Sequence, residues 1–336
     1  MVQLTADRLS EIQKGFKNKR IAVIGDLMLD RYFWGKVSRI SPEAPVPVVD
    51  IDEESTRLGG AANVANNIAS LDGVPVMIGV VGKDTGAELL RALVAEKGFP
   101  VEGIVSDGTR PTTIKTRVIA HSQHVVRIDQ EEKIDLDAGM QKKVLDILEN
   151  QIKSLDGIIL EDYNKGVLTK ELIKSVIQLA KDNRKIITVD PKSNNFFEYK
   201  GVSVFKPNRK EAEEALGCRL NTMKDIEKAL HDLLEKLAAD NVLLTLGEMG
   251  MILLQRGGSP VHVKTRARHV ADVSGAGDTV IATLTMAMAA GATVQESASL
   301  ANYAGGIVCG EVGIVPIEKE ILLQAILKDN GGGVNR

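Results

Sequence analysis

The sequence contains few of the residues that mark several classes of protein. Only two of its 336 residues are cysteine, Cys218 and Cys309, which argues against a disulfide framework and predicts buried thiols in a reducing compartment. Aromatic residues make up 3%, which leaves little surface for stacking nucleic-acid bases. No apolar run is long enough to span a bilayer, and the polar segment 5–20 lacks the apolar core of a signal peptide. We therefore expect a cytoplasmic protein.

The chain also lacks a large net charge of either sign. The net charge is −3, with 26% charged and 44% hydrophobic residues, as is ordinary for a globular chain. This balance gives no reason to expect nucleic acid or an acidic membrane as a partner. The length allows one large α/β domain or two ordinary ones.

The chain alternates between apolar runs and helical patterns, most regularly from residue 138 onward. Nearly continuous apolar runs of this kind are typical of strands buried on both faces. Their alternation with helices predicts an α/β fold with a parallel sheet and helices on both faces. Ligands of such sheets bind at the carboxyl ends of the strands. The apolar runs are 21–24, 74–81, 157–160, 186–189 and 242–245, and the later helical patterns are 138–154, 169–182 and 222–238.

Two irregular segments interrupt this alternation. Segment 31–57 holds three prolines in a short stretch, which excludes a central strand there because proline cannot donate to the ladder. Segment 112–129 is β-branched and partly alternating, which predicts a hairpin. We expect the two segments to form one small β-lid over the sheet. The predicted organisation is a single domain at 1–330 with a flexible tail at 331–336.

The stretch Asp272-Val-Ser-Gly-Ala-Gly-Asp278 precedes a segment that is small and apolar on nearly every side, 279–290. A helix that is apolar all round is buried, and Gly291 suits the position just past its end. Gly275 and Gly277 allow close approach of the backbone at the helix N-terminus, where N–H groups lack partners. Such a loop suits an anion, for example a phosphate.

Asp278 does not suit a simple phosphate site. A carboxylate there would repel the phosphate, unless it takes a proton from an attacking hydroxyl. An aspartate in the first turn of a helix is also a common stabilising device, and Gly-x-Gly before a helix often occurs by chance. The heptapeptide alone does not decide between these readings.

Two motifs carry a resemblance to a known family. Gly59-Gly-Ala-Ala-Asn-Val-Ala65 and Asp272-Val-Ser-Gly-Ala-Gly-Asp-Thr279 resemble the two signatures of the ribokinase-like (PfkB) sugar kinases. The resemblance covers essentially the whole chain, and the motifs lie in the expected order on either side of the alternating pattern. It implies a ribokinase-like three-layer α/β sandwich with a mostly parallel sheet and a small β-lid.

Finer motifs resemble the heptose-phosphate kinase branch of that family. The resemblance implies ATP-dependent phosphorylation of D-glycero-D-manno-heptose 7-phosphate at its anomeric hydroxyl, giving the 1,7-bisphosphate for ADP-heptose and lipopolysaccharide core synthesis. Many such kinases are fused to a C-terminal nucleotidyltransferase. This sequence stops after the kinase, so it is either a stand-alone kinase or part of a longer chain. The motifs are Gly25 to Tyr32, Ser41 to Val48, Val125 to Asp129 and Asp162 to Gly166.

The resemblance also implies roles for residues around the sugar. Asp278 would be the catalytic base, and the backbone N–H groups of its glycine loop would form an anion hole for the transferred phosphoryl oxygens. Asp30 would accept hydrogen bonds from sugar hydroxyls, although a solvated loop carboxylate is its alternative reading. The sugar would also lie against the Gly-Gly-x-x-Asn motif. The residues are Gly275, Ala276 and Gly277 for the anion hole and Gly59, Gly60 and Asn63 beside the sugar.

On the nucleotide side, Asn208-Arg-Lys-Glu211 matches the family's Asn-x-x-Glu, which acts near the ATP phosphates and the water shell of Mg²⁺. Asn208 is also a good helix cap, and both roles are compatible. The family further implies ATP contacts at Thr245, Gly247 and Asn302. Some relatives bind a monovalent cation such as K⁺ where this chain has Asp272 and Ser274.

A phosphorylated acceptor needs cationic partners, because an uncompensated phosphate charge in a closed site is costly. Lys165 and Lys192 follow strands, at the edge where ligands bind. Arg39 and Arg127 in the lid are further candidates. Each of the four also suits a solvated surface charge. Lid strands with exposed aromatics need a cover, which predicts a homodimer through the lid.

Two other functions stay open. One is a kinase of the same family for another sugar, a ketohexose phosphate or a nucleoside. The other is a non-catalytic sugar- or nucleotide-binding regulator, since a fold does not fix a function. An intact base, glycine loop and Asn-x-x-Glu argue against a regulator, which would have no need of Asp278.

Overall fold

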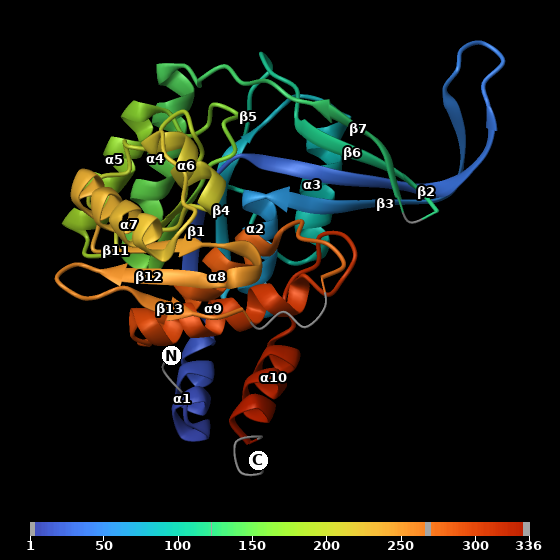
Figure 1. Cartoon of the computed structure of the whole chain (residues 1–336). Coiled ribbons are helices and arrows are strands. Elements are labelled where there is room, and N and C mark those ends of the chain that lie inside the picture. Colours follow the sequence, from blue (N-terminus) through green and yellow to red (C-terminus); the bar gives the residue numbers. More distant parts are fainter. Residues whose placement is uncertain (1–3, 122, 266–269, 332–336) are drawn as a thin grey trace.

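The fold is centred on one large sheet, seen in a computed structural model that describes residues 4–121, 123–265 and 270–331 (Figure 1). In the described residues this sheet has nine strands in the order β13-β12-β11-β10-β9-β8-β1-β4-β5. Neighbouring strands pair in parallel from β5 to β11, while β12 is antiparallel to both of its neighbours. The sheet is therefore mostly parallel, as the alternating pattern predicts. Its strands are β1 (Arg20–Gly25), β4 (Val74–Val81), β5 (Ile104–Ser106), β8 (Gly157–Glu161), β9 (Ile186–Asp190), β10 (Val204–Phe205), β11 (Asn241–Thr245), β12 (Met251–Gln255) and β13 (Val261–Val263).

Helices cover both faces of this sheet. Alternate residues of one strand belong to different cores, because successive side chains of a strand point to opposite faces. In β1, Ile21 and Val23 pack with α1, α2, α3, α8, α9 and α10, while Ala22 and Ile24 pack with α4, α5, α6 and α7. The result is three layers. The helices are α1 (Ala6–Phe16), α2 (Ala61–Ser70), α3 (Thr85–Glu96), α4 (Ala138–Gln151), α5 (Lys170–Asp182), α6 (Arg209–Leu216), α7 (Met223–Leu237), α8 (Ala276–Ala289), α9 (Val294–Val308) and α10 (Lys319–Gly331), with short 3₁₀ turns at Ile152–Ser154 and Gly247–Met249.

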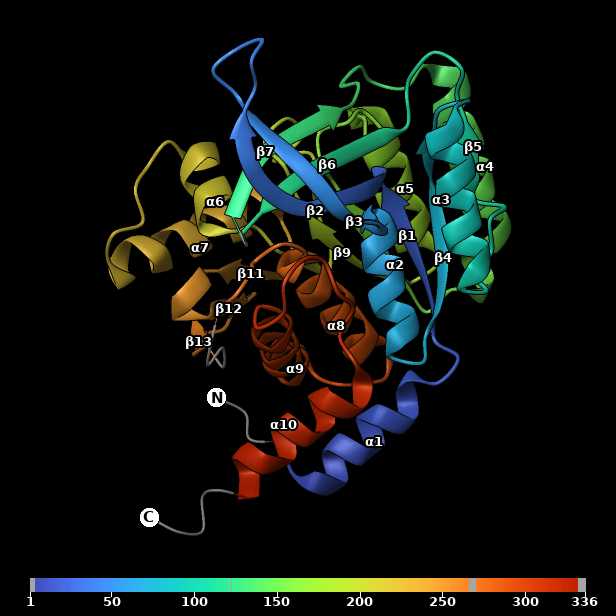
Figure 2. The same ribbon diagram turned by 90° about the vertical axis from the view of Figure 1, so that its right-hand side faces the viewer.

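A second, smaller sheet is built from the two irregular segments. Its order is β3-β2-β6-β7, from β2 (Leu27–Ile40), β3 (Pro47–Gly60), β6 (Thr113–Ala120) and β7 (Gln123–Gln130). The two hairpins join through a parallel pairing of β2 with β6. The tip of the β2–β3 hairpin projects from the body (Figures 1 and 2). We call these four strands the small sheet.

Helix α8 is as buried as its composition predicts. Every residue from Asp278 to Ala287 is buried, and the helix packs beside α2 and α9 (Figure 2). Gly291 follows its end with φ of 86°, a left-handed conformation that favours glycine. A long buried helix therefore fixes the position of its own N-terminus, where the Gly-Ala-Gly-Asp sequence lies.

Several smaller expectations can be compared with the structure. Both cysteines are free thiols, but Cys218 is exposed, so the expectation that both are buried is wrong; Cys218 follows Gly217, the left-handed residue that ends α6 at the surface. Among the described residues no helix is long and apolar enough to cross a membrane. Residue 331 ends α10, and the rest of the predicted tail, 332–336, lies outside the described residues.

Candidate active site

The N-terminus of α8 supplies the centre of the site. Gly275 is its N-cap in a left-handed conformation, with φ of 77°, and Ala276, Gly277 and Asp278 form the first turn. N–H groups of a first turn have no partner within the helix, and the helix dipole makes this end positive. Ala276 N donates to Val273 O across the turn at 3.3 Å. The three residues expected of an anion hole thus lie together at one helix end.

Asp278 is buried and held from two sides. Asn63 Nδ2 donates to Asp278 Oδ2 at 2.7 Å, and the Tyr163 hydroxyl donates to Oδ1 at 2.8 Å. Burial raises the pKa of Asp278 to about 6, while the hydrogen bonds from Asn63 and Tyr163 act in the opposite direction. A carboxylate with a pKa in this range is ionised at neutral pH and still able to accept a proton from a reacting group.

The Gly59-Gly60 turn positions Asn63 on α2. Gly60 has φ of 55° and a β-carbon there would collide with Asp26 O, so glycine lets the chain turn from β3 into the helix. One helical turn on, Asn67 Nδ2 donates to Asn63 O at 3.0 Å. The Asn67 side-chain oxygen accepts a hydrogen bond from Thr279 Oγ1 at 3.0 Å. Asparagines four residues apart therefore tie α2 to the first turn of α8.

Asp26 positions Tyr163. This buried aspartate follows β1, and its carboxylate accepts hydrogen bonds from the backbone N–H groups of Tyr163, Lys165 and Val167 at 2.7, 3.1 and 3.3 Å. The loop after β8 is therefore wrapped around a single side chain. This arrangement holds the Tyr163 ring at a fixed place beside Asp278.

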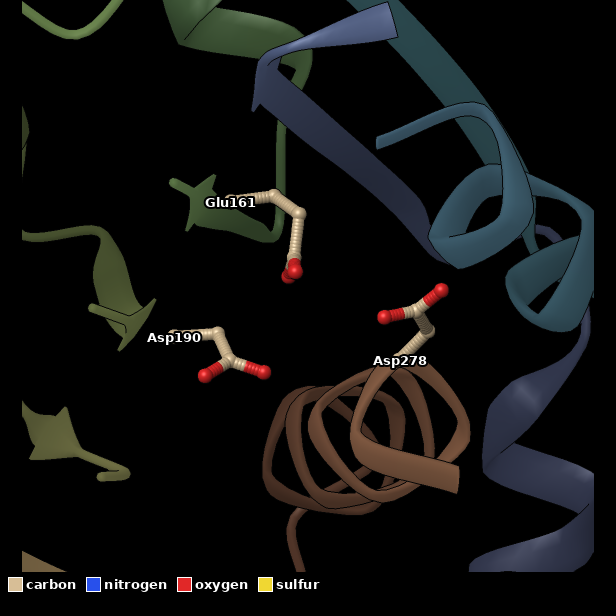
Figure 3. A group of neighbouring side chains, drawn as sticks. All are labelled: Glu161, Asp190 and Asp278. Carbon is tan, nitrogen blue, oxygen red and sulfur yellow. The ribbon is translucent and has the colours of Figure 1, made fainter. Parts of the chain in front are cut away.

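Three carboxylates converge at the ends of neighbouring elements. Glu161 ends β8 and Asp190 ends β9, and both point toward Asp278 (Figure 3). One carboxylate oxygen from each of the three lies within 4.8 Å of the others, and all three side chains are buried. Burial, followed by the charges of Asp190 and Asp278, raises the pKa of Glu161 well above its usual range. The cluster therefore concentrates negative charge beside the α8 N-terminus.

Lys206 compensates part of this charge. Its ammonium group, which is also buried, lies 2.7 Å from Asp190 Oδ2. Burial alone would lower the pKa of Lys206, but the charge and hydrogen bond of Asp190 more than offset this and raise it. The lysine therefore remains a cation at the edge of the cluster.

The carboxylate cluster fits a hydrated Mg²⁺. Mg²⁺ prefers oxygen ligands and usually keeps several of its waters, so one or two carboxylates beside a phosphate site suit it. Glu161 Oε2 is buried without a hydrogen-bond partner, as is expected of an oxygen that a cation or its water would engage. Glu211, by contrast, uses both oxygens within the chain: Oε1 accepts from Lys192, and Oε2 from Asn208 N at 2.8 Å.

A cavity of about 850 Å³ opens from this cluster. It extends from Asp278 and the glycine loop toward the β11–β12 turn and α9. Of the residues expected to act near ATP, Asn208, Thr245, Gly247 and Asn302 line this cavity, whereas Glu211 does not. The cavity is large enough for a nucleotide-sized ligand. Its lining includes Tyr163, Asp190, Lys192, Lys206, Asn208, Thr245, Gly247, Gly275, Ala276, Gly277, Asp278 and Asn302.

Asn208 caps α6, as its alternative reading predicts. Its side chain accepts from Glu211 N at 2.9 Å and Glu211 returns the bond, which completes a capping box. Lys192 pairs with Glu211 and so lies on the cavity side of Asp278. Further along the cavity, Asn302 Nδ2 donates to Lys264 O at 2.7 Å, which leaves its side-chain oxygen available.

Asp272 ties two loops together. Its Oδ1 accepts from Ser274 N at 2.9 Å and its Oδ2 from Gly313 N at 3.0 Å. These hydrogen bonds outweigh burial and lower the pKa of the carboxyl. Asp272 and Ser274 therefore stand next to each other just before the glycine loop, with Asp272 ionised.

Asp30 lies on β2 of the small sheet and does not line the 850 Å³ cavity. It is buried and forms an ion pair with Arg117, so it is not a solvated loop carboxylate. A β-carbon at Gly59 would overlap Asp30 Oδ2, and the absence of a side chain there leaves room for the carboxylate. Asp30, Gly59, Gly60 and Asn63 are thus brought together, as the motifs imply.

The four cations considered for an acceptor phosphate do not gather. Lys165 lies outside the 850 Å³ cavity and pairs with Glu131 at 2.7 Å. Arg127 is exposed and pairs with Asp129 at 2.9 Å, and Arg39 is exposed near the hairpin tip. Only Lys192 of the four lines the cavity.

Some residues of the site were not assigned a role from the sequence. Tyr163 contacts Asp278 across 115 positions of sequence, and no local pattern signals that contact. Glu161, Asp190 and Lys206 each follow or end an apolar run, which does place them at the carboxyl edge of the sheet. Their place at the ends of apolar runs is the sequence feature that could have identified them as site residues.

Comparisons with known proteins identify the family of the chain and proteins that share its fold. The profile of the pfkB family of carbohydrate kinases matches residues 18–320. The bifunctional protein HldE of Helicobacter pylori (strain J99) is 44% identical over 295 residues, which are 88% of this chain and 64% of that protein. The chain therefore spans less than two thirds of the length of this relative.

Solved structures share the fold at low identity. Arabidopsis thaliana ribokinase complexed with ribose and ATP has a TM-score of 0.72 at 19% identity, covering 92% of this chain and 99% of that one. Escherichia coli phosphofructokinase-2 in complex with potassium has a TM-score of 0.75 at 19% identity, covering 94% and 99%. The predicted ribokinase-like α/β fold with a small second sheet is confirmed.

Proposed function

This chain belongs to the pfkB family of carbohydrate kinases, and from that premise we propose that it transfers the γ-phosphoryl group of ATP to the anomeric hydroxyl of D-glycero-D-manno-heptose 7-phosphate. The product is the heptose 1,7-bisphosphate used for ADP-heptose and lipopolysaccharide core synthesis. The observation that carries the kinase chemistry is the buried Asp278 carboxylate at the glycine-rich N-terminus of α8, beside a nucleotide-sized cavity. The choice of heptose rests on the four finer motifs and on the similarity to HldE.

Asp278 is the base in this mechanism. The acceptor hydroxyl gives its proton to the Asp278 carboxylate as its oxygen attacks the γ-phosphorus, and the bond between that phosphorus and the β–γ bridging oxygen breaks, releasing ADP. Backbone N–H groups of Gly275, Ala276 and Gly277 stabilise the charge on the transferred oxygens. Asn63 orients the carboxylate through its hydrogen bond.

ATP occupies the cavity in this proposal, with its base and ribose near Thr245, Gly247 and Asn302 and its phosphates near Asn208. Lys192 and Lys206 provide positive charge at the phosphate end. Glu161 and Asp190 would hold Mg²⁺, with Glu211 acting through water, and the ion neutralises phosphate charge when it is bound. Asp272 and Ser274 are the candidate site for a monovalent cation such as K⁺, an ion named in one structural relative.

On the acceptor side, Asp30 accepts hydrogen bonds from sugar hydroxyls, and the sugar lies against Gly59, Gly60 and Asn63. Lys165 and Lys192 remain candidates for contact with an acceptor phosphate. A non-catalytic regulator is disfavoured because burial of Asp278, Glu161 and Asp190 together is costly without a catalytic or metal-binding role.

A coupled assay of ADP release tests the proposal. The purified chain is given Mg²⁺-ATP with heptose 7-phosphate, free heptose, fructose 6-phosphate, ribose or a nucleoside as acceptor. We expect kcat/KM for heptose 7-phosphate to exceed every other value. A higher value for an unphosphorylated sugar or a nucleoside would contradict the proposal in favour of another kinase, and no turnover with any acceptor would favour a regulator.

We also propose that the small sheet pairs with a second copy of the chain. Edge strand β7 is exposed along its length, and its Val126 and Ile128 are 47% and 57% exposed. Exposed apolar residues on an edge strand favour a cover. Light scattering at micromolar concentration should give the mass of a dimer, and Ile128→Asp should give a monomer. A monomeric wild-type chain would contradict the pairing.

A further inference from the structure

The small sheet carries one lysine whose ammonium group stands apart from the ion pairs around it. Strand register places Lys115 of β6 directly between Asp30 of β2 and Asp129 of β7. In-register neighbours share a face of the sheet, so both carboxylates are positioned to flank Lys115. In the part of the chain that the structure describes, neither comes within 4 Å of its ammonium group.

The two carboxylates instead pair with arginines two positions along the same face. Asp30 binds Arg117, and Asp129 binds Arg127 at 2.9 Å. Arg117 and Arg127 are themselves in register across β6 and β7. These five side chains comprise three cations and two carboxylates, and Lys115 is the one cation among them that forms no ion pair with either carboxylate.

Lys115 faces the catalytic base across a single aromatic ring. Its Nζ lies 4.7 Å from the ring centre of Tyr163, and the hydroxyl of that ring donates to Asp278 Oδ1 at 2.8 Å. One tyrosine ring and one hydrogen bond therefore separate the Lys115 ammonium group from the Asp278 carboxylate. A sugar whose reacting hydroxyl meets Asp278 can reach Lys115 with a group at its other end.

The unpaired positive charge of Lys115 is unfavourable in the ligand-free protein. Burial lowers the pKa of Lys115, and the nearby charges of Lys165 and Arg117 add to that effect against the opposing charge of Asp30. The other lysines near the site avoid this cost through carboxylates: Lys165 pairs with Glu131 and Lys206 with Asp190. An anion placed beside Lys115 would relieve the cost there, because it supplies the missing opposite charge.

We propose that Lys115 binds the distal phosphate of a phosphorylated sugar whose reacting hydroxyl lies at Asp278. The ligand class is a sugar phosphate monoester, and Lys115 thereby selects phosphorylated acceptors over free sugars. This inference rests on the proposed sugar-phosphate kinase function and names the residue that gives it its specificity. The positively charged Lys115 acts as a point charge for the phosphate, while its contact with the Tyr163 ring keeps it in place.

The test is Lys115→Met, with KM measured separately for each substrate. Loss of one charge-assisted contact should raise KM for heptose 7-phosphate about 10- to 100-fold. KM for ATP should change less than about twofold, because the cavity residues are untouched. The advantage of heptose 7-phosphate over free heptose in kcat/KM should shrink by the same factor, and Lys115→Arg should recover most of it.

One matched variant controls for charge and position, and a second tests the competing lysine. Lys36→Met removes an exposed lysine of β2 in the same small sheet and should change the acceptor KM less than about threefold. Lys165→Met removes a candidate that is paired with Glu131, and it should raise the acceptor KM less than Lys115→Met does. Calorimetric titration of heptose 7-phosphate into each variant without ATP gives a second readout, in which Lys115→Met should lose the most affinity and Lys36→Met none. Lys115→Gln replaces Lys115→Met if the latter melts at a lower temperature than the wild type.

The outcomes separate this inference from the proposed function. A wild-type enzyme that prefers heptose 7-phosphate, with an unchanged acceptor KM in Lys115→Met, would overturn the role of Lys115 alone. A larger effect of Lys165→Met than of Lys115→Met would do the same. A wild-type enzyme that uses free sugars as well as phosphorylated ones would overturn both.

Discussion

The two sides of Asp278 are built differently. On the cavity side, helices and strand ends present cations that are already matched by carboxylates, as in the pairs Lys192–Glu211 and Lys206–Asp190. On the small-sheet side, Asp30 is packed against glycine and bound by Arg117, while Lys115 forms no ion pair with any carboxylate among the described residues. The cations of the nucleotide side are therefore paired in the absence of a ligand. On the acceptor side, Lys115 is available to pair with an anionic ligand. Changes on the two sides should therefore affect different kinetic constants.

The largest effect is expected where the two sides meet. Asp278→Asn keeps the shape of the side chain and removes the proton acceptor, so kcat should fall about 10²–10⁴-fold while KM for both substrates stays nearly unchanged. Initial rates of ADP release measure this directly. Asp7→Asn, an exposed aspartate in the first turn of α1 and outside the cavity, is the matched control and should retain kcat. Near-normal kcat in Asp278→Asn would remove the base from the mechanism.

A change on the acceptor side should separate the two KM values. The β-carbon of Gly59→Ala would overlap Asp30 Oδ2 and displace that carboxylate from its place beside Arg117. We expect KM for the acceptor to rise about 10- to 100-fold and KM for ATP to change less than about twofold. Gly258→Ala, where a β-carbon meets no atom closer than 3.4 Å, is the matched control. Equal rises in both KM values would mean that the two sides are not independent.

Lowering the pH should act first on the catalytic base Asp278, rather than on the nucleotide side or the acceptor side. Burial raises the pKa of Asp278 to about 6, so the carboxylate becomes protonated as the pH falls through 6. The active form is the ionised one, and kcat should therefore drop about tenfold by pH 5. A pH–rate profile measures the drop, and circular dichroism over the same range confirms that the chain stays folded. A flat profile from pH 8 to pH 5 would contradict the assignment.

The smallest effect is expected on the nucleotide side. Asn208→Ala removes the side-chain half of the capping box of α6, which costs about 1 kcal/mol and loosens Glu211. KM for ATP should rise about fivefold, and KM for the acceptor should stay within about twofold. Thr222→Ala removes the corresponding cap of α7, away from the cavity, and controls for the loss of stability. An effect confined to the acceptor KM would reverse the assignment of the two sides.

Residues on the cavity side could be predicted from the sequence better than residues on the acceptor side. The motif at 272–278 predicted the glycine loop, and the apolar runs predicted the strands whose ends carry Glu161 and Asp190. These features are local, because consecutive residues determine where a helix begins or a strand ends. The expected three-layer sandwich followed from the same local patterns together with the family resemblance.

The acceptor side depends on pairings that no local pattern records. Whether Asp30 binds Lys115 or Arg117 is decided by strand register and side-chain direction, and both were invisible in the sequence. Lys165 follows a strand as expected, but Glu131 from the end of the other hairpin neutralises it. The contact of Tyr163 with Asp278 is made from the loop after β8, whose backbone is bound by the Asp26 carboxylate.

Phosphorus NMR of the reaction product tests the central claim most directly, because it reports where the phosphoryl group goes. The purified chain is incubated with Mg²⁺-ATP and D-glycero-D-manno-heptose 7-phosphate, and the Asp278→Asn variant is run beside it. We predict that the 7-phosphate signal persists while a second phosphate signal coupled to the anomeric proton appears, in step with ADP and in the wild type alone. A phosphate on any other carbon, or ADP formed with free phosphate and no bisphosphate, would contradict the account.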